Sequence, residues 1–179
     1  MMLLAAVTLL ASLAAANEIK DCGLTPGAVF HDATVSPDPV IVPGSMTLAF
    51  QGDLRSDWPD DMILKVEVIK EDPYDIEVPC MKGLGSCDVD MCDYITKFPD
   101  VFCPLFPPDI PCGCVLKAGH YQSDGFKITL PDLGEAIDKI IAGGYHGNVT
   151  LFSKSAPATL LGCLSFNFNL KYEPPTADN

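Results

Sequence analysis

The sequence is poor in basic residues: it has 11 lysines and arginines against 24 aspartates and glutamates, a formal net charge of -13. Nucleic-acid binding needs a basic face that meets phosphate, so the composition excludes this class of function. The charge also excludes simple electrostatic docking on anionic membranes at neutral pH. In an acidic compartment the carboxyl groups, with ordinary pKa values of about 4, begin to lose their charge and the repulsion weakens.

Motifs that carry catalysis are missing as well. The segment GLGSC at 83–87 is not the G-x-S-x-G turn that exposes the nucleophile of many serine hydrolases. The three histidines are far apart in the sequence, which favours surface or turn positions over a catalytic triad: His31, His120 and His146. We therefore expect a protein that is not an enzyme and that uses no cofactor.

A metal site is not expected either. Asp88, Asp90 and Asp93 resemble the start of a calcium-binding loop, but Asp93 and Pro99 stand where that loop needs glycine and glutamate. We interpret these aspartates as a helix cap and solvated surface.

Long apolar runs are confined to the first residues. Met1 to Ala16 carries no charged side chain, and its apolar run ends in three alanines before Asn17. This pattern is typical of a secretory signal peptide. A membrane anchor, the alternative, needs about 18 or more apolar residues. We expect residues 1–16 to be a signal peptide and residues 17–179 to be one secreted domain.

The eight cysteines all follow this leader, and an even count in a secreted chain favours disulfides. Cys112 and Cys114 are separated by one residue, a spacing that is unusual for zinc ligands and too short for a mutual disulfide, so they should have different partners. Spacing alone leaves roughly a hundred connectivities open. Six cysteines lie between Cys80 and Cys114, which predicts local bridges, and Cys22 and Cys163 lie near the two ends.

Short alternating segments predict β-strands. In 163–172, apolar and polar residues alternate without a break, the pattern of a half-buried antiparallel strand. Similar strands are predicted over 28–35, 45–51, 63–68, 75–78, 125–130 and 148–152. About seven to eight antiparallel strands with Pro/Gly turns between them predict an all-β open sandwich or cup.

Two short helices are predicted between the strands. In 88–98, apolar residues recur at helical spacing, with Asp88 or Asp90 as the N-cap. In 132–144, an apolar stripe precedes Gly143, which ends the helix. The stretch 101–114 contains four prolines and is expected to be irregular.

The chain is 48% hydrophobic although much of it must face water. Part of the excess is the leader, and the rest fits a protein that lines an internal apolar cavity as well as a core. An ordinary sandwich core fits the composition too. Candidate lining residues are phenylalanines on the apolar strand faces: Phe50, Phe126, Phe166 and Phe168.

Several segments together resemble the ganglioside GM2 activator family, lysosomal sphingolipid activators of the MD-2-related (ML) lipid-recognition superfamily. They are SPDPVIVPGSMTLAFQG, VPCMKGLGSCDVDMCDYI, CPLFPPDIPCGCVLKAGHY and LLGCLSFNFNLK, and the resemblance spans Cys22 to Tyr172. It implies a β-cup that encloses a large lipid cavity and carries four disulfides. Carried over by position, the disulfides join Cys22 to Cys163, Cys80 to Cys87, Cys92 to Cys114 and Cys103 to Cys112.

The resemblance also implies a function. Members of the family extract a glycolipid or phospholipid from a membrane, in transient contact with its surface, and present it to a soluble β-hexosaminidase without doing bond chemistry. A secreted carrier of sterols or other lipids is the alternative among binding proteins. A small secreted lipid hydrolase is the alternative among enzymes, and the missing serine turn and C-C-x-x-H motif argue against it.

Two departures from the family concern the cavity rim and the glycosylation site. The rim loop of the family carries a membrane-inserting tryptophan, whereas the matching stretch 134–147 here has isoleucines and the only tryptophan, Trp58, lies elsewhere. We expect a membrane-contact loop there, made of Leu133, Ile137, Ile140 and Ile141, although such a stripe also fits a core helix. The family has a sequon where GSMT stands here, at 44–47. The sequon of this chain is displaced to Asn148-Val149-Thr150, so Asn148 is the predicted glycosylation site.

Overall fold

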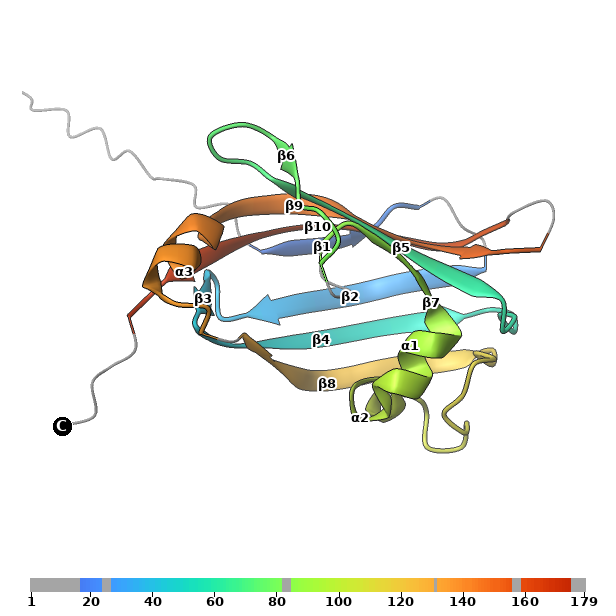
Figure 1. Ribbon diagram of the computed structural model, residues 1–179. Helices are drawn as coiled ribbons and strands as arrows, with labels where there is room; N and C mark the ends of the chain where they lie inside the picture. The colour runs from blue at the N-terminus through green and yellow to red at the C-terminus, as the bar shows by residue number, and fades with distance from the viewer. Residues whose placement is uncertain (1–16, 24–26, 82–84, 131, 156–158, 175–179) are drawn as a thin grey trace, which may run out of the picture.

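The alternating segments form two β-sheets that face each other (Figure 1). The structure is a computed structural model that describes residues 17–23, 27–81, 85–130, 132–155 and 159–174, without the side chains of residues 101 and 126. The predicted signal peptide, residues 1–16, lies outside the described residues. The all-β prediction is confirmed, with ten strands in the described part of the chain where seven to eight were expected.

The larger sheet has seven strands and is built around a long antiparallel hairpin. Its strands are β1 (Glu18–Asp21), β3 (Val40–Val42), β5 (Met62–Lys70), β6 (Ile76–Glu77), β7 (Cys87–Asp90), β9 (Gly143–Ser153) and β10 (Thr159–Tyr172). The main order is β1-β10-β9-β5-β6, and β7 pairs with β5. The short strand β3 pairs with the end of β10, and this is the one parallel pairing between named strands in the described part of the chain.

The smaller sheet has three antiparallel strands in the order β2-β4-β8. They are β2 (Ala28–Ser36), β4 (Gly44–Leu54) and β8 (Gly119–Leu130). In β4 the even-numbered residues from Met46 to Leu54 share one face, because side chains alternate along a strand. Leu54 packs in the core between the sheets, so this face is the inner one.

The predicted helix after β7 is present as α1 (Met91–Lys97). Of the two proposed caps, Asp90 is the N-cap, and its Oδ1 accepts hydrogen bonds from the backbone N–H groups of Cys92 (2.9 Å) and Asp93 (3.1 Å). The Lys154 ammonium, 2.6 Å from the other oxygen, holds the pKa of Asp90 below its ordinary value. These bonds explain why the chain turns from strand to helix at this residue.

The expectation that 101–114 lacks regular structure is wrong for its first part. Helix α2 (Pro99–Phe102) and the 3-10 turn η1 (Cys103–Leu105) cover it. Pro99 and Pro104 stand in the first turn of these helical segments, where the missing N–H of proline has no helical partner to lose. The prolines therefore start short helical turns here instead of preventing them.

The packed core lies at one end of the molecule, beneath α1 and α2 (Figure 1). Its buried residues are Ala28, Trp58, Met62, Ile95 and Leu116. Half-buried side chains from both sheets and from α1, α2 and the following loop complete it, among them Phe30, Leu54, Phe102, Phe106 and Leu151. The remaining length of the two sheets extends beyond this core towards α3 (Glu135–Ile141).

Four disulfides brace the fold: Cys22–Cys163, Cys80–Cys87, Cys92–Cys114 and Cys103–Cys112. They are the same four pairs that the family resemblance implies, and Cys112 and Cys114 have different partners. Two of them tie α1 and the α2 segment to the following loop, and Cys80–Cys87 closes the loop between β6 and β7. The packed end therefore holds two of the four covalent bridges, Cys92–Cys114 and Cys103–Cys112.

Candidate functional site

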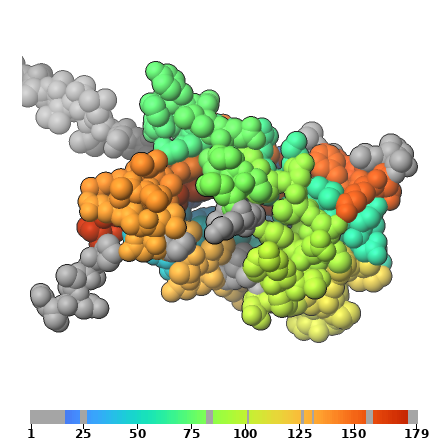
Figure 2. All heavy atoms as spheres, in the orientation of Figure 1, coloured from blue at the N-terminus to red at the C-terminus, as the bar shows by residue number. Residues whose placement is uncertain are grey.

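Beyond the packed core, the inner faces of both sheets carry apolar side chains that are only half-buried. In an ordinary sandwich such side chains meet the opposite sheet and lose contact with water. Here they retain exposure along the length of four strands: Met46, Leu48, Phe50, Leu64, Val66, Val68, Val149, Leu164, Phe166, Phe168 and Leu170. The sheets therefore enclose an open apolar space. Figure 2 shows the surface hollowed between α3 and the segment from β6 to α1, with strands of the smaller sheet visible in its depth.

An aromatic row forms part of the wall of this space on β9 and β10. Tyr145 and Phe168 stack with ring centroids 5.3 Å apart, and Phe166 follows at 5.7 Å from Phe168. The strand register sets Phe166 opposite Gly147. A Cβ at Gly147 would lie 2.8 Å from the Phe166 ring and 1.9 Å from the Glu67 carbonyl oxygen, so the ring occupies the space that glycine leaves.

The other two predicted cavity residues lie on the smaller sheet. Phe50 is half-buried on the inner face of β4, in line with Leu48 and Met46. The backbone of Phe126 pairs with Leu48 in the β4–β8 register, and its side chain lies outside the described part. Their contact with a lipid stays a prediction.

Helix α3 stands at the open end and has its apolar side turned outward. Ile140 is 71% exposed and Ile137 and Leu133 are each 48% exposed, whereas Asp138 is fully buried. The Tyr145 hydroxyl donates a 2.6 Å hydrogen bond to the Ile141 carbonyl and ties the helix to the aromatic row. Burial raises the pKa of this phenol. Three of the four residues of the predicted membrane-contact loop are therefore exposed, and Ile141 is half-buried; contact with a membrane stays a prediction.

A second exposed apolar group lies around β6, next to the same opening (Figure 1). Tyr74 is 77% exposed, Ile76 is 53% exposed and Met81 is 64% exposed. The sequence pattern predicted a half-buried strand over 75–78. The strand is shorter, Ile76–Glu77, with one further backbone hydrogen bond from Val78 N–H to the Val68 carbonyl, and Ile76 is exposed to solvent. Acidic residues and prolines interrupt the apolar positions of this segment. This interruption is the feature of the sequence that could have indicated a rim loop.

Polar groups gather where the interior meets solvent. The Lys70 ammonium lies 5.9 Å from the centroid of the Tyr145 ring, and the Lys139 ammonium lies 5.7 Å from that of Tyr172. The Lys139 ammonium also donates to Glu135 at 2.6 Å, and this contact raises the pKa of Lys139. The open end can thus meet a hydrated group at its edge and an apolar group inside.

Each histidine contacts a carboxylate. On the three-stranded sheet, His31 Nε2 and His120 Nδ1 approach the two oxygens of Asp53, and His120 Nδ1 lies 2.8 Å away. At the open end, His146 Nδ1 lies 3.1 Å from the Glu71 carboxylate. The histidines are about half-exposed surface groups, as expected from their spacing in the sequence.

Within the described ranges, no group of three or more histidine, cysteine, aspartate or glutamate side chains is arranged to hold a metal ion. A separate search of the same residues finds no helix with the length and apolar character to cross a membrane.

These features define the class of the molecule: an open, disulfide-bridged cup of two β-sheets with an apolar interior and an apolar rim. No family model matches the chain. The chain is 32% identical to the ganglioside GM2 activator of Mus musculus over 152 residues, 80% of this chain and 76% of the mouse protein. It is 28% identical to the ganglioside GM2 activator of Macaca fascicularis over 157 residues, 80% and 77% of the two chains.

The chain therefore belongs to the ganglioside GM2 activator family, as its motifs predicted. Two solved structures are similar at a TM-score of 0.45. One is the C-terminal domain of wzt, with 12% identity over 88% of this chain and 80% of that chain. The other is a Niemann-Pick type C2 protein from the Japanese carpenter ant, with 13% identity over 86% and 99%. At these scores we base no conclusion on either.

Proposed function

We propose that this protein is a non-catalytic lipid-transfer and activator protein of the lysosomal lumen or the extracellular space. It takes up a glycolipid or phospholipid from a membrane and presents the headgroup to a soluble glycosidase such as a β-hexosaminidase. One observation carries the proposal: the apolar inner faces of the two sheets are only half-buried and keep part of their surface in contact with solvent. The names of the mouse and macaque relatives support it.

The interior suits an acyl chain on energetic grounds. Transfer of a methylene group from water to an apolar surrounding is favourable by about 0.8 kcal/mol. The apolar interior of the cup gives an acyl chain much of the same transfer free energy that it has in the bilayer. A lipid can therefore move from the membrane into the cup at small net cost. The aromatic row and the aliphatic side chains facing it supply the apolar contacts, and the headgroup stays at the mouth beside Lys70 and Lys139.

The exposed apolar rim explains how the mouth meets a membrane. Exposed apolar side chains lie on both sides of the mouth: Ile137 and Ile140 on α3, and Tyr74 and Ile76 around β6. Exposure of such large apolar side chains to water is unfavourable. On a bilayer the same side chains enter the headgroup and acyl boundary, which favours contact without a spanning helix. The membrane-contact loop and the β6 rim then flank the opening through which the lipid passes.

A test measures transfer of a fluorescent glycolipid between vesicles at acidic pH, with thermal melts alongside. Phe166→Trp enlarges a side chain of the interior and is expected to keep the fold but reduce transfer. Phe152→Trp is the matched control, because Phe152 lies on the outer face of the same sheet. Equal transfer by both folded variants would show that the lipid does not occupy the space beside Phe166.

A further inference from the structure

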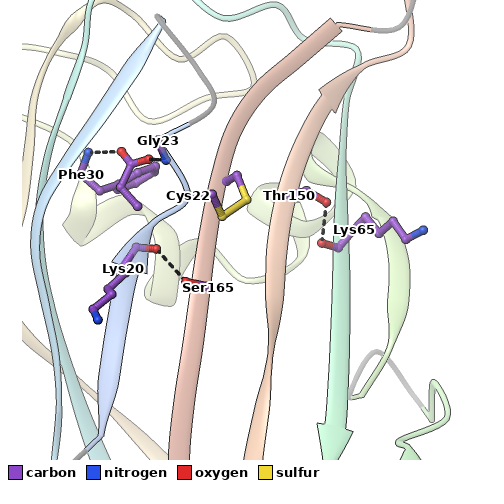
Figure 3. The surroundings of a disulfide bond; sticks show 9 residues. Lys20, Cys22, Gly23, Phe30, Lys65, Thr150 and Ser165 are labelled. Atoms are coloured by element: carbon purple, nitrogen blue, oxygen red, sulfur yellow. Dashed lines mark hydrogen bonds between the residues drawn. A yellow bond between two sulfur atoms is a disulfide. The ribbon is translucent and has the colours of Figure 1, made fainter.

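The outer face of the seven-stranded sheet, turned away from the three-stranded sheet, bears a groove along β9. The groove has a volume of about 530 Å³ and is lined by Lys65, Glu67, Asn148, Thr150, Phe152 and Ser165. A second hollow of about 250 Å³ continues it past Lys20 and His146 and shares Asn148 and Ser165 with the first. Figure 3 shows Lys65, Thr150 and Ser165 on neighbouring strands beside the Cys22–Cys163 disulfide.

The sequon lies in the floor of this groove. Asn148 and Thr150 are two residues apart on β9, so their side chains point to the same face. In the register, Asn148 lies between Glu67 of β5 and Ser165 of β10, at the centre of the sheet. The Asn148 side chain is exposed, and its amide has no hydrogen-bond partner among the described residues.

The lining suits a carbohydrate. Sugar hydroxyls need donors and acceptors of hydrogen bonds, and the floor and walls offer hydroxyl, amide, ammonium and carboxylate groups. Phe152 lies four residues along β9 from Asn148, about 13 Å away, and its ring offers an apolar surface to a sugar face. A groove of this volume is within the range of roughly 300–1,000 Å³ that holds small ligands.

We propose that Asn148 carries an N-linked glycan whose first sugars lie in this groove and cover the outer face of the seven-stranded sheet. The linkage forms in the secretory pathway, where a lipid diphosphate carries the oligosaccharide. Asn148 Nδ2 bonds to the anomeric carbon of the first sugar, the bond from that carbon to the diphosphate oxygen breaks, and the amide loses one proton. The proposal goes beyond lipid transfer and requires only that the chain enters this pathway.

The modification is tested on the full chain expressed in animal cells and recovered from the secretory pathway. Intact mass before and after enzymatic removal of N-glycans is expected to reveal one oligosaccharide on the natural protein and on Thr150→Ser, which keeps the sequon. Thr150→Val, of similar volume, and Asn148→Gln are expected to lack it. An unmodified Asn148 in the recovered natural protein overturns the proposal, whatever the result of lipid-transfer assays.

The position of the first sugars in the groove is tested by the rate at which a small amine-reactive reagent labels individual lysines, measured by peptide mass spectrometry. Lys65 and Lys20 line the groove, whereas Lys127 lies on β8 of the other sheet. Labelling of Lys65 and Lys20 is expected to be several-fold slower in glycosylated Thr150→Ser than in bare Thr150→Val, with Lys127 unchanged. If Lys65 and Lys20 are labelled at equal rates in the two variants, the first sugars do not lie in the groove, because the glycan then extends into solvent.

Discussion

The two ends of the cup are built from the same strands in different ways. At the packed end, Met62 and Trp58 are 0% and 4% exposed under α1, and disulfides brace the adjoining loops. At the open end, Phe166 and Phe168 on β10 keep contact with solvent, and the neighbouring helix turns Ile140 outward. A compact, covalently braced core at one end can therefore support an unfilled apolar space at the other.

The difference matters because an unfilled apolar space lowers stability. Side chains without partners on one side lose the dispersion contacts that a close-packed interior provides. The stability of the fold must then come largely from the packed end, while the open end is available for binding. Substitutions at the two ends are expected to separate stability from lipid transfer.

The largest effect is expected from loss of the Cys22–Cys163 bridge, which joins residues 141 positions apart. Replacing both cysteines by serine removes the longest loop constraint on the unfolded chain, about 5 kcal/mol in the loop-entropy model. The matched control is the double serine variant at Cys80–Cys87, with a separation of 7 residues and a smaller predicted loss of about 2 kcal/mol. Denaturant unfolding compares them, and equal losses would contradict the prediction.

The next largest effect is a difference in the loss of unfolding free energy between two positions on the inner face of β5. Met62 is fully buried in the core, and Met62→Ala is expected to cost about 3 kcal/mol of unfolding free energy. Leu64, two residues further along the same face, is half-buried in the open part, so Leu64→Ala is expected to cost clearly less but to change lipid transfer. A larger stability loss for Leu64→Ala would mean that the sheets close over it and that the cavity lies elsewhere.

The rim is expected to affect binding and not folding. Ile140→Asp with Ile141→Asp removes apolar contact with the bilayer, and we expect vesicle binding to weaken by about 2 kcal/mol or more. Val115→Asp is the control, since Val115 is also exposed but lies at the packed end. Vesicle flotation measures binding and circular dichroism measures folding. Unfolding of the double variant, or equal binding by the Val115 variant, would contradict a membrane role for this loop.

Sequence alone predicted the parts of the fold that depend on local pattern. The alternation in 163–172 is present as the C-terminal part of β10, and the cap at Asp90 starts α1 as expected. The sequence could not show which side of an amphipathic helix faces inward: α3 buries Asp138 and exposes Ile140. That choice depends on whether a cavity or a core lies beneath the helix, which is decided by strands distant in the chain.

Residues brought together only by sheet register were also beyond prediction. His31, Asp53 and His120 come from three different strands and meet because β4 pairs with both β2 and β8. Nothing in the local sequence around either histidine indicates the shared carboxylate. The rim at Tyr74 and Met81 was missed for a related reason, because exposure of apolar residues is not visible in a strand-like pattern.

The smallest expected effect concerns this histidine–aspartate cluster, which lies at the packed end, on the outer face of the smaller sheet, next to Leu54 in the chain. Hydrogen bonds from His31 and then His120 hold the pKa of Asp53 below its ordinary value of 3.8. The same contact with Asp53, with a lesser contribution from Gln122, raises the pKa of His120 above 6.5. The groups facing one another come from β2, β4 and β8, so the cluster links all three strands of the smaller sheet.

The sign of the pH effect follows from these two shifts. The raised pKa of His120 contributes stability that is fully present below pH 6.5 and is lost as the pH rises through the folded-state value. The lowered pKa of Asp53 contributes stability that is present above pH 3.8 and is lost as the pH falls through its folded-state value. Their joint contribution is therefore greatest in the acidic range between these values.

Because the groups are exposed, the effect on melting temperature should be small. Thermal melts across pH measure this effect. His120→Gln is expected to lower the melting temperature more at acidic pH than at neutral pH. Lys127→Gln, which changes a charge on the same strand, is expected to show no such dependence on pH. Parallel pH profiles for the natural protein and His120→Gln would show that the cluster adds nothing to the packed end, and the contrast between the two ends would then rest on core and disulfides alone.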